Sequence, residues 1–133
     1  MVTYGGLQTW VAVPVNALLV AYLALFPALF AFVMRPLLVV HGARALMAAP
    51  FVWVATELGR THLFGGFPWA LLGYSQVTML PVAQLASLLG VHGVSAFVAS
   101  VSAAAAALVA TTSVRDRVRA VGSVAMAVVL VAV

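Results

Sequence analysis

The sequence predicts an all-α membrane protein, a polytopic transmembrane helix bundle fragment of about four helices. Apolar residues make up 66% of its 133 residues, and charged residues make up only 6%. A soluble domain carries about 25% charged residues, so this composition excludes a water-soluble fold. The mean hydropathy of +1.24 agrees with that conclusion. We therefore treat residues 1–133 as a single membrane domain.

The first predicted span covers about residues 15–33 and has no charged side chain. A helix needs about 20 apolar residues to cross a hydrocarbon core about 30 Å thick, and this run is long enough. Pro27 lies inside the span. Membrane helices tolerate a proline kink where neighbouring helices or waters satisfy the freed carbonyl, so we expect a kinked helix here.

The second predicted span, about residues 45–59, is short. At about 1.5 Å per residue it is only about 22 Å long. Pro50 falls near its start, where proline fits the first turn of a helix. We expect a short helix followed by a loop of about residues 60–91.

The third predicted span, about residues 92–112, is rich in alanine, serine and valine. Small side chains let another helix approach closely, and they recur here at Ser95, Ala99, Ser102 and Ala106. The fourth span, about residues 118–133, is still apolar at its last residue. This pattern predicts a helix that continues further, and hence a truncated chain.

The arginines predict the orientation of these spans. Five of the six fall between spans or just inside a span end, in two regions that are separated by two crossings: Arg35, Arg44, Arg115, Arg117 and Arg119. Both regions therefore lie on one side of the membrane, which the positive-inside rule makes cytoplasmic. The loop of about residues 60–91, which contains only Arg60, is then extracytoplasmic, as are residues 1–14.

Charge and cysteine content exclude several function classes. The net charge of +4 would favour nucleic acid in a soluble protein, but topology explains these arginines, and we expect no nucleic-acid partner. Cysteine is absent, so these residues hold no disulfide, thiolate metal site or cysteine nucleophile. The histidines lack metal-ligand spacing, and we expect no metal, no cofactor and solvated positions for His41, His62 and His92.

Several motifs together carry a family resemblance. They are residues 18–30, residues 49–60 with Trp53, Glu57 and Arg60, the sequence Gly65-Gly66-Phe67-Pro68-Trp69, the sequence Leu72-Gly73-Tyr74-Ser75-Gln76, and residues 85–97. In this order and spacing they resemble the membrane domain of bacterial apolipoprotein N-acyltransferases. The Gly-Phe-Pro-Trp and Gly-Tyr-Ser-Gln pair at this separation is the most specific part.

The resemblance implies an enzyme of the bacterial cytoplasmic (inner) membrane. Such an enzyme transfers an acyl chain from a phospholipid to the amino group of the diacylglyceryl-modified N-terminal cysteine of a lipoprotein. The thioester-forming cysteine of the family, with a glutamate and a lysine, belongs to a nitrilase-like extracytoplasmic domain that follows the membrane helices. This sequence has neither cysteine nor lysine, so we expect no catalytic residue and no activity from it alone. Further helices ahead of Met1 are also implied.

The membrane part would then position the phospholipid donor and the lipoprotein acceptor. Six side chains are candidate lipid contacts: Glu57, Arg60, Phe67, Trp69, Tyr74 and Gln76. Tryptophan and tyrosine favour the headgroup level, and the glycines and Pro68 allow irregular backbone where protein or water covers it. A plainer alternative makes the two aromatic residues ordinary interfacial anchors.

Glu57 and Arg60 are three residues apart and therefore lie on one helical face. The planar guanidinium of Arg60 suits a phospholipid phosphate, with Glu57 orienting it. The alternative is a structural ion pair that closes the helix end. A triad of Ser75, His62 and Glu57 is disfavoured because no Gly-x-Ser-x-Gly turn accompanies the serine.

Two other function classes stay open at this point. One is a transporter or channel piece in which Glu57 and Arg60 line a polar path, as intramembrane charges often do. The other is a structural helical scaffold that binds a partner protein. Internal repeat symmetry in the flanking reading frame would favour the transporter, and a downstream nitrilase-like segment would favour the acyltransferase.

Overall fold

The structure is a computed structural model that describes residues 8–63, 66–110, 114–115, 117–119 and 121–122. Every regular element in this part is helical, and no strand occurs within it. In chain order the elements are α2 (Thr9–His41), the 3-10 helix η1 (Gly42–Ala48), α3 (Ala49–His62), the 3-10 helix η3 (Leu72–Gln76), α4 (Leu80–Ala83) and α5 (Ala86–Ala110). The predicted all-α class is confirmed at this level.

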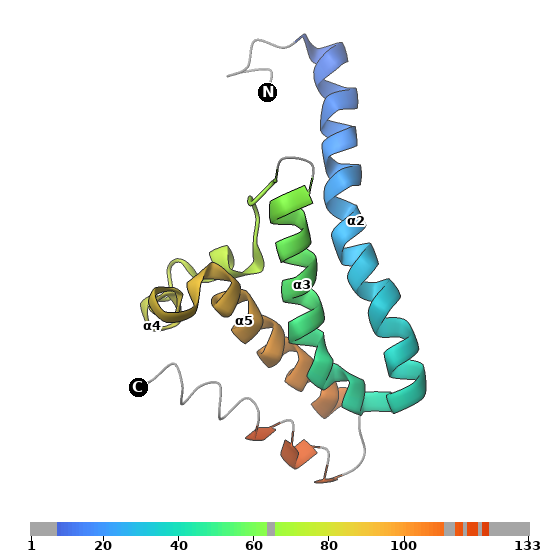
Figure 1. Ribbon diagram of the computed structural model, residues 1–133, viewed down its shortest axis with the longest axis vertical. Coiled ribbons are helices and arrows are strands. Elements are labelled where there is room, and N and C mark those ends of the chain that lie inside the picture. The colour runs from blue at the N-terminus through green and yellow to red at the C-terminus, as the bar shows by residue number, and fades with distance from the viewer. Residues whose placement is uncertain (1–7, 64–65, 111–113, 116, 120, 123–133) are drawn as a thin grey trace.

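The long helix α2 has 33 residues and extends beyond the predicted span of residues 15–33 at both ends. At about 1.5 Å per residue it is about 50 Å long, which exceeds a hydrocarbon core of about 30 Å. It curves along its length and contains Pro14, Pro27 and Pro36 (Figure 1). Large apolar side chains project from it, as on a surface that faces lipid: Trp10, Leu18, Phe32 and Val39.

The chain reverses direction at the end of α2. Gly42 adopts φ of 58°, in the left-handed region that favours glycine, and its N–H donates to the carbonyl of Leu38. The helix η1 then leads into α3, which runs back beside α2 (Figure 1). Pro50 occupies the first turn of α3, as expected, and the helix ends at His62 rather than near residue 59.

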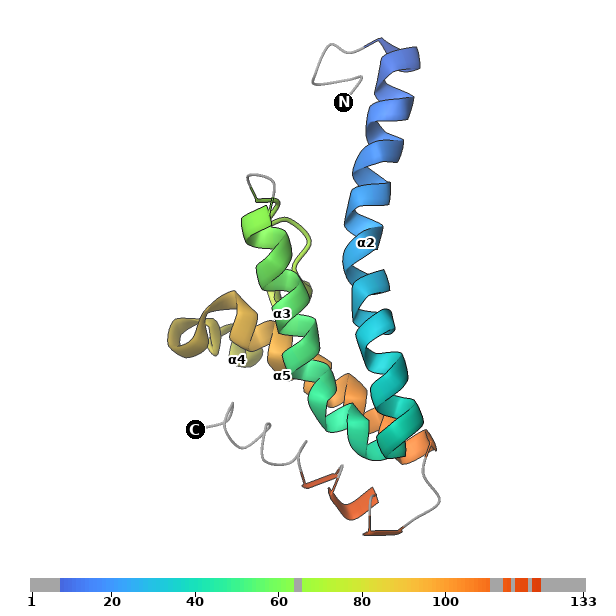
Figure 2. The same ribbon diagram turned by 45° about the vertical axis from the view of Figure 1, so that its right-hand side comes forward.

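The segment predicted as a loop, about residues 60–91, is partly helical. It contains η3 and α4, and α5 begins at Ala86 rather than near residue 92. Gly90, with φ of 67°, separates the first turn of α5 from the rest of the helix. Val82 and Leu85 pack on Val94 of α5 in a small apolar cluster. This cluster places α4 on the side of α3 and α5 that is away from α2 (Figure 2).

Two helical stretches of the described part are long and apolar enough to cross a membrane, Thr9–His62 and Ala86–Ala110. The first contains the turn at η1, so it includes two of the predicted spans, and the second includes most of the third. The fourth predicted span, about residues 118–133, lies largely outside the described residues. The complete four-span bundle stays a prediction.

Candidate functional site

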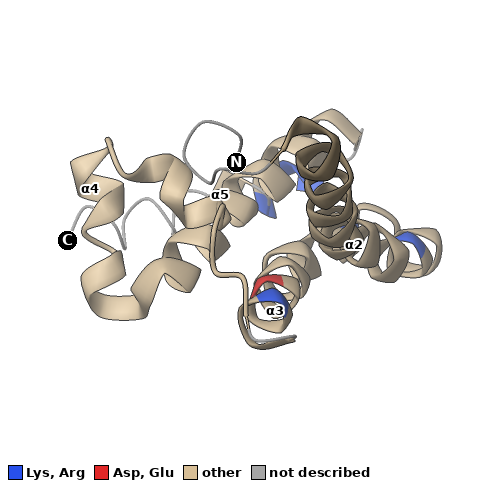
Figure 3. Ribbon diagram, turned by 90° about the horizontal axis from the view of Figure 1, so that it is seen from above, with Lys and Arg blue, Asp and Glu red and all other residues tan. Residues whose placement is uncertain are grey.

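The candidate site is the segment of residues 66–76, which folds back onto α3 and α5. Its first residues continue from the end of α3 through backbone hydrogen bonds: Gly66 N donates to Leu63 O and Phe67 N to Arg60 O, each at 3.0 Å. Further along, side chains of α3 and α5 bind its backbone. The acidic part of α3 (red) and the basic part of α3 (blue) lie next to each other in Figure 3.

Glu57 of α3 accepts a hydrogen bond from the first residue of η3. Its side chain is only 2% exposed, and Oε1 accepts hydrogen bonds from Leu72 N at 2.7 Å and from Trp53 Nε1 at 3.0 Å. Leu72 is the first residue of η3, where a backbone N–H has no partner within the helix. A carboxylate satisfies such a donor with a short, charge-assisted bond. Glu57 therefore determines where η3 begins relative to α3.

The second carboxylate oxygen of Glu57 faces α5. Oε2 lies 3.7 Å from Nδ1 of His92, and neither atom has a hydrogen-bond partner. A buried carboxyl oxygen without a hydrogen-bond partner is costly, and the imidazole of His92 is the polar group that lies close to it. The expected solvated position of His92 is therefore wrong. Its ring is half-buried against Glu57, because α5 begins earlier than predicted and carries His92 inside the helix.

Arg60 donates a hydrogen bond to the backbone in the middle of the segment 66–76. Its side chain is buried, and Nη2 donates to the carbonyl of Ala70 at 3.1 Å. Ala70 has φ of 55°, a strained value for a residue with a Cβ, and the bond from Arg60 helps to hold it there. The guanidinium carbon also lies 6.0 Å from the ring centroid of Phe26 in α2, at cation–π distance. Arg60 thus connects the segment with both α2 and α3.

Glu57 and Arg60 do not form the ion pair that their spacing allows. Within the described part of the chain, Glu57 Oε2 lies 3.7 Å from Nδ1 of His92, and Arg60 donates to Ala70. The physical reason is that the returning segment offers backbone groups that would otherwise be buried without partners. Each side chain satisfies one of these groups. The two residues share a helical face but act on different parts of the segment.

Gly73 packs closely against α5. Its N–H donates to Oγ of Ser95 at 2.8 Å, and Ser95 is fully buried. A Cβ at position 73 would lie 2.5 Å from the carbonyl oxygen of Val91 and 3.2 Å from the backbone N of Ser95. Only glycine fits at this distance. The glycine of the Gly-Tyr-Ser-Gln motif is therefore explained by its packing against α5.

The remaining candidates lie on the outside of the segment. The side chains of Trp69 and Tyr74 are 71% and 50% exposed, and Phe67 lies beside Trp69 with ring centroids 5.5 Å apart. Gln76 is half-buried and donates from Nε2 to Oγ of Ser75 at 2.9 Å. The six candidates thus divide into two buried residues that bind backbone and four outer residues, of which the aromatic ones present apolar surface.

The sequence does not reveal three partners in this site, which are Trp53 and His92 for Glu57 and Ser95 for Gly73. It indicates Ser95 only as a small residue at a helix contact, and nothing in its neighbourhood indicates a bond to Gly73. The disfavoured triad does not assemble, because Ser75 Oγ donates to Leu72 O while His62 Nδ1 lies near Leu58 O. The described residues contain no cluster of three or more metal-ligating side chains.

Comparison with known proteins gives a consistent result. A family model described as Apolipoprotein N-acyltransferase N-terminal domain matches residues 1–104. The chain is 45% identical over 97 residues to an apolipoprotein N-acyltransferase of Geobacter metallireducens, which covers 73% of this chain and 18% of that protein. It is 41% identical over 113 residues to the enzyme of the same name from Chromobacterium violaceum, covering 85% and 22%. For the Pasteurella multocida enzyme the identity is 39% over 114 residues, covering 86% and 21%.

The chain spans about a fifth of the length of the curated relatives it matches. No solved structure matches it. The matched region contains all of the segment 66–76 and the α3 and α5 residues that hold it.

Proposed function

This chain belongs to the apolipoprotein N-acyltransferase family through its N-terminal domain, and from that premise we propose that it positions the lipid substrates for acyl transfer. The donor would be a membrane phospholipid, and the acceptor would be the diacylglyceryl-modified N-terminal cysteine of a lipoprotein. Both keep their acyl chains in the bilayer, so a membrane domain is the part that can align them. Alignment of two reactants lowers a barrier by removing their freedom to move apart.

One observation carries this proposal. The backbone of residues 66–76 is held at three points by buried side chains, with Glu57 accepting from Leu72, Arg60 donating to Ala70 and Ser95 accepting from Gly73. The exposed rings of Trp69 and Tyr74 are therefore attached to a fixed backbone. An aromatic ring with one polar edge suits the boundary between acyl chains and head groups.

A fixed backbone favours substrate positioning over simple anchoring. An interfacial anchor needs only an aromatic side chain at the right depth, and α2 already provides Trp10, which is 75% exposed. The segment instead uses buried charged groups, which are costly in an apolar surrounding, to define its conformation. A defined conformation is what a substrate surface requires.

The proposal assigns bond making to other parts of the full-length enzyme. The sequence has no cysteine and no lysine, the residue types that the family uses with a glutamate for its thioester chemistry. Glu57 is nearly fully buried, and its Oε1 is already used by Leu72 and Trp53. The residues of this chain would bring lipid to the thiol without reacting themselves.

The same proposal places the segment on the extracytoplasmic side of the inner membrane. Arg44 and Arg119 line one cavity, so two of the arginine-bearing regions lie at the same end of the helices, as the predicted orientation requires. The segment 66–76 does not line this cavity. An extracytoplasmic segment would lie on the side where the nitrilase-like domain is expected.

Photo-crosslinking tests the proposal. Benzoylphenylalanine would replace Trp69, or Trp10 as a control of nearly equal exposure, in the full-length enzyme in phosphatidylethanolamine and phosphatidylglycerol vesicles. We expect a several-fold higher yield of phospholipid adduct at position 69, measured by mass spectrometry, because lipid would be held there. Equal yields at the two positions would show that Trp69 meets only bulk lipid, and the proposal would fail.

A further inference from the structure

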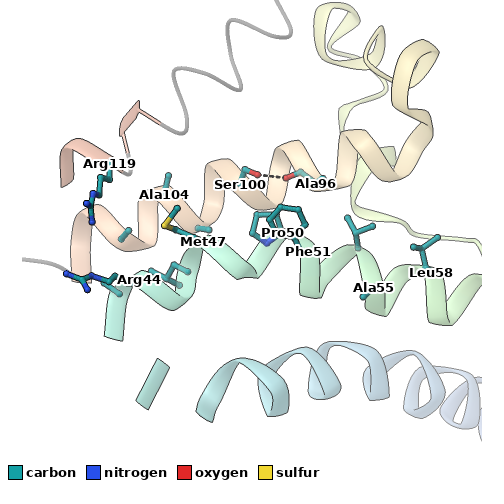
Figure 4. Close-up of a pocket in the computed structure, with 15 residues that line it drawn as sticks. Arg44, Met47, Pro50, Phe51, Ala55, Leu58, Ala96, Ser100, Ala104 and Arg119 are labelled. Carbon is teal, nitrogen blue, oxygen red and sulfur yellow. Dashed lines mark hydrogen bonds between the residues drawn. The ribbon is translucent and has the colours of Figure 1, made fainter. Parts of the chain in front are cut away.

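A cavity of about 550 Å³ lies between α5 and the continuous η1–α3 segment, away from the residues of the candidate site. Its η1–α3 wall includes Met47, Pro50 and Phe51, and its α5 wall includes Ala96, Ala103 and Ala104 (Figure 4). Bulky side chains thus face small ones across an open space. We call this space the α3–α5 groove. Its volume is in the range of about 300–1,000 Å³ that holds small ligands.

The chemistry of the groove changes along its length. Most of the wall is apolar, and the hydroxyl of Ser100 in that wall already donates to the carbonyl of Ala96 at 2.7 Å. At one end, Arg44 from η1 and Arg119 from the segment 117–119 both border the groove (Figure 4). Such a lining suits an occupant that is apolar over most of its length and carries an anionic group at the end next to the two arginines.

The length of the groove matches one leaflet of a bilayer. Along α5 the lining runs from Ala96 to Ala107, which is about 16 Å at 1.5 Å per residue. Half of a hydrocarbon core about 30 Å thick is about 15 Å. When the two arginines lie at headgroup level, the far end of the groove reaches the middle of the bilayer.

We propose that the α3–α5 groove binds one acyl chain of an anionic glycerophospholipid, with its phosphate between Arg44 and Arg119. Guanidinium groups bind phosphate through paired hydrogen bonds, and basic pockets between transmembrane helices suit anionic head groups. The orientation predicted from the arginines puts this lipid in the cytoplasmic leaflet. It is therefore distinct from the donor and acceptor lipids at the segment 66–76, and it would join η1 to the segment 117–119.

Photoactivatable lipids test this site directly. The full chain would be placed in phosphatidylcholine vesicles that contain a trace of phosphatidylglycerol, or of phosphatidylcholine, with a diazirine on one acyl chain. Mass spectrometry would then locate the labelled peptides. We expect the phosphatidylglycerol probe to label η1–α3 and α5 lining residues at least about fivefold more than the phosphatidylcholine probe, since each arginine near the head group favours an anionic lipid.

Matched variants separate the groove from general surface charge. The double change Arg44→Gln and Arg119→Gln should lower labelling by phosphatidylglycerol roughly tenfold. The control Arg35→Gln and Arg115→Gln removes the same charge from exposed positions outside the groove and should leave labelling unchanged. Ala103→Phe should block the groove with both arginines in place, whereas Ala105→Phe, at an exposed position outside it, should not.

Three results would overturn the proposal. Equal labelling by the two lipid probes would show that no anionic head group is selected. An equal loss in the two double-arginine variants would assign the effect to overall charge. Undiminished labelling of the lining residues in the Ala103→Phe variant would show that the acyl chain lies outside the groove.

Discussion

The two faces of α3 differ in chemistry: one carries hydrogen-bonding side chains and the other carries apolar side chains. On the face toward the segment 66–76, the half-buried Trp53 and the buried Glu57 and Arg60 make directional hydrogen bonds. On the face toward the groove, Phe51, Val54, Ala55 and Leu58 present apolar surface to a cavity. Both sets recur at the three- and four-residue spacing of one helical face. One short helix can therefore hold a backbone segment on one side while it borders an open cavity on the other.

The face toward the segment should be intolerant of change, and Gly73→Ala tests this most severely. The added Cβ would lie 2.5 Å from the carbonyl oxygen of Val91, so the segment must move away from α5. We expect the free energy of unfolding of the full-length enzyme to fall by about 3 kcal/mol or slightly more, at the upper end of overpacking costs, because the atoms met are backbone atoms. Denaturant titration in detergent measures it.

Gly59→Ala is the matched control for that change. A Cβ at position 59 would have Leu63 Cδ1 as its nearest neighbour, at 3.9 Å, which is an ordinary van der Waals contact. Alanine also favours helix by about 1 kcal/mol over glycine. Equal destabilisation by the two substitutions would contradict the close packing of Gly73 on α5.

The next largest effect should come from Glu57→Ala. It removes the acceptor of both Leu72 N and Trp53 Nε1 and leaves two donors without partners. Each unsatisfied buried donor costs about 1–3 kcal/mol, and because Trp53 is only half-buried we expect a loss of about 2–3 kcal/mol, below the sum for two buried donors. Glu57→Gln keeps an acceptor oxygen and should cost less in the same titration. Equal losses would show that the charge, rather than the hydrogen bonds, is what the site requires.

Ser95→Ala should have a smaller effect, about 1–2 kcal/mol, because it removes the acceptor of a single backbone N–H, that of Gly73. Ser102→Ala is the control on the same helix. Its hydroxyl is exposed and donates only to the carbonyl of Val98, four residues before it, so its loss should change stability by less than about 0.5 kcal/mol. If the two serines prove equivalent, Ser95 does not hold the segment.

The smallest effect should come from the groove face. Ala103 is half-buried and lines the cavity, so Ala103→Leu can extend into existing space. We expect a change of less than about 0.5 kcal/mol, in contrast to the cost of overpacking a filled core, about 1–3 kcal/mol. A loss in that higher range would mean that α3 and α5 are tightly packed there, and the contrast between the two faces would disappear.

Composition and spacing are sufficient to predict the helical class, and they single out the polar stretch of residues 57–76 as the candidate site. The apolar runs indicate helices, and the polar stretch of residues 57–76 contains Glu57 and Arg60 together with the backbone groups that they bind, those of Leu72 and Ala70. Bounds were less accurate, because α2 extends to both sides of its apolar run and α5 begins before Gly90. A helix continues wherever backbone bonds can be made, whereas hydropathy marks only the part suited to lipid.

The bonding partners could not be predicted. The spacing of Glu57 and Arg60 shows that they share a face, but their partners come from other elements: Leu72 lies 15 residues beyond Glu57, and Ala70 lies 10 residues beyond Arg60. The bond between Gly73 and Ser95 joins residues 22 apart. Such contacts depend on how the chain returns to α3. Periodicity within one helix carries no information about that path.

The central claim is that the fixed segment 66–76 handles substrate rather than anchors the protein. Trp69→Ala in the full-length enzyme tests it most directly, through single-turnover formation of the acyl-enzyme from phospholipid together with thermal unfolding in the same detergent. The account predicts acylation slowed by about tenfold, equivalent to about 1.4 kcal/mol in the barrier, with the unfolding temperature unchanged. Unchanged acylation together with a lowered unfolding temperature would contradict it and leave Trp69 as an interfacial anchor.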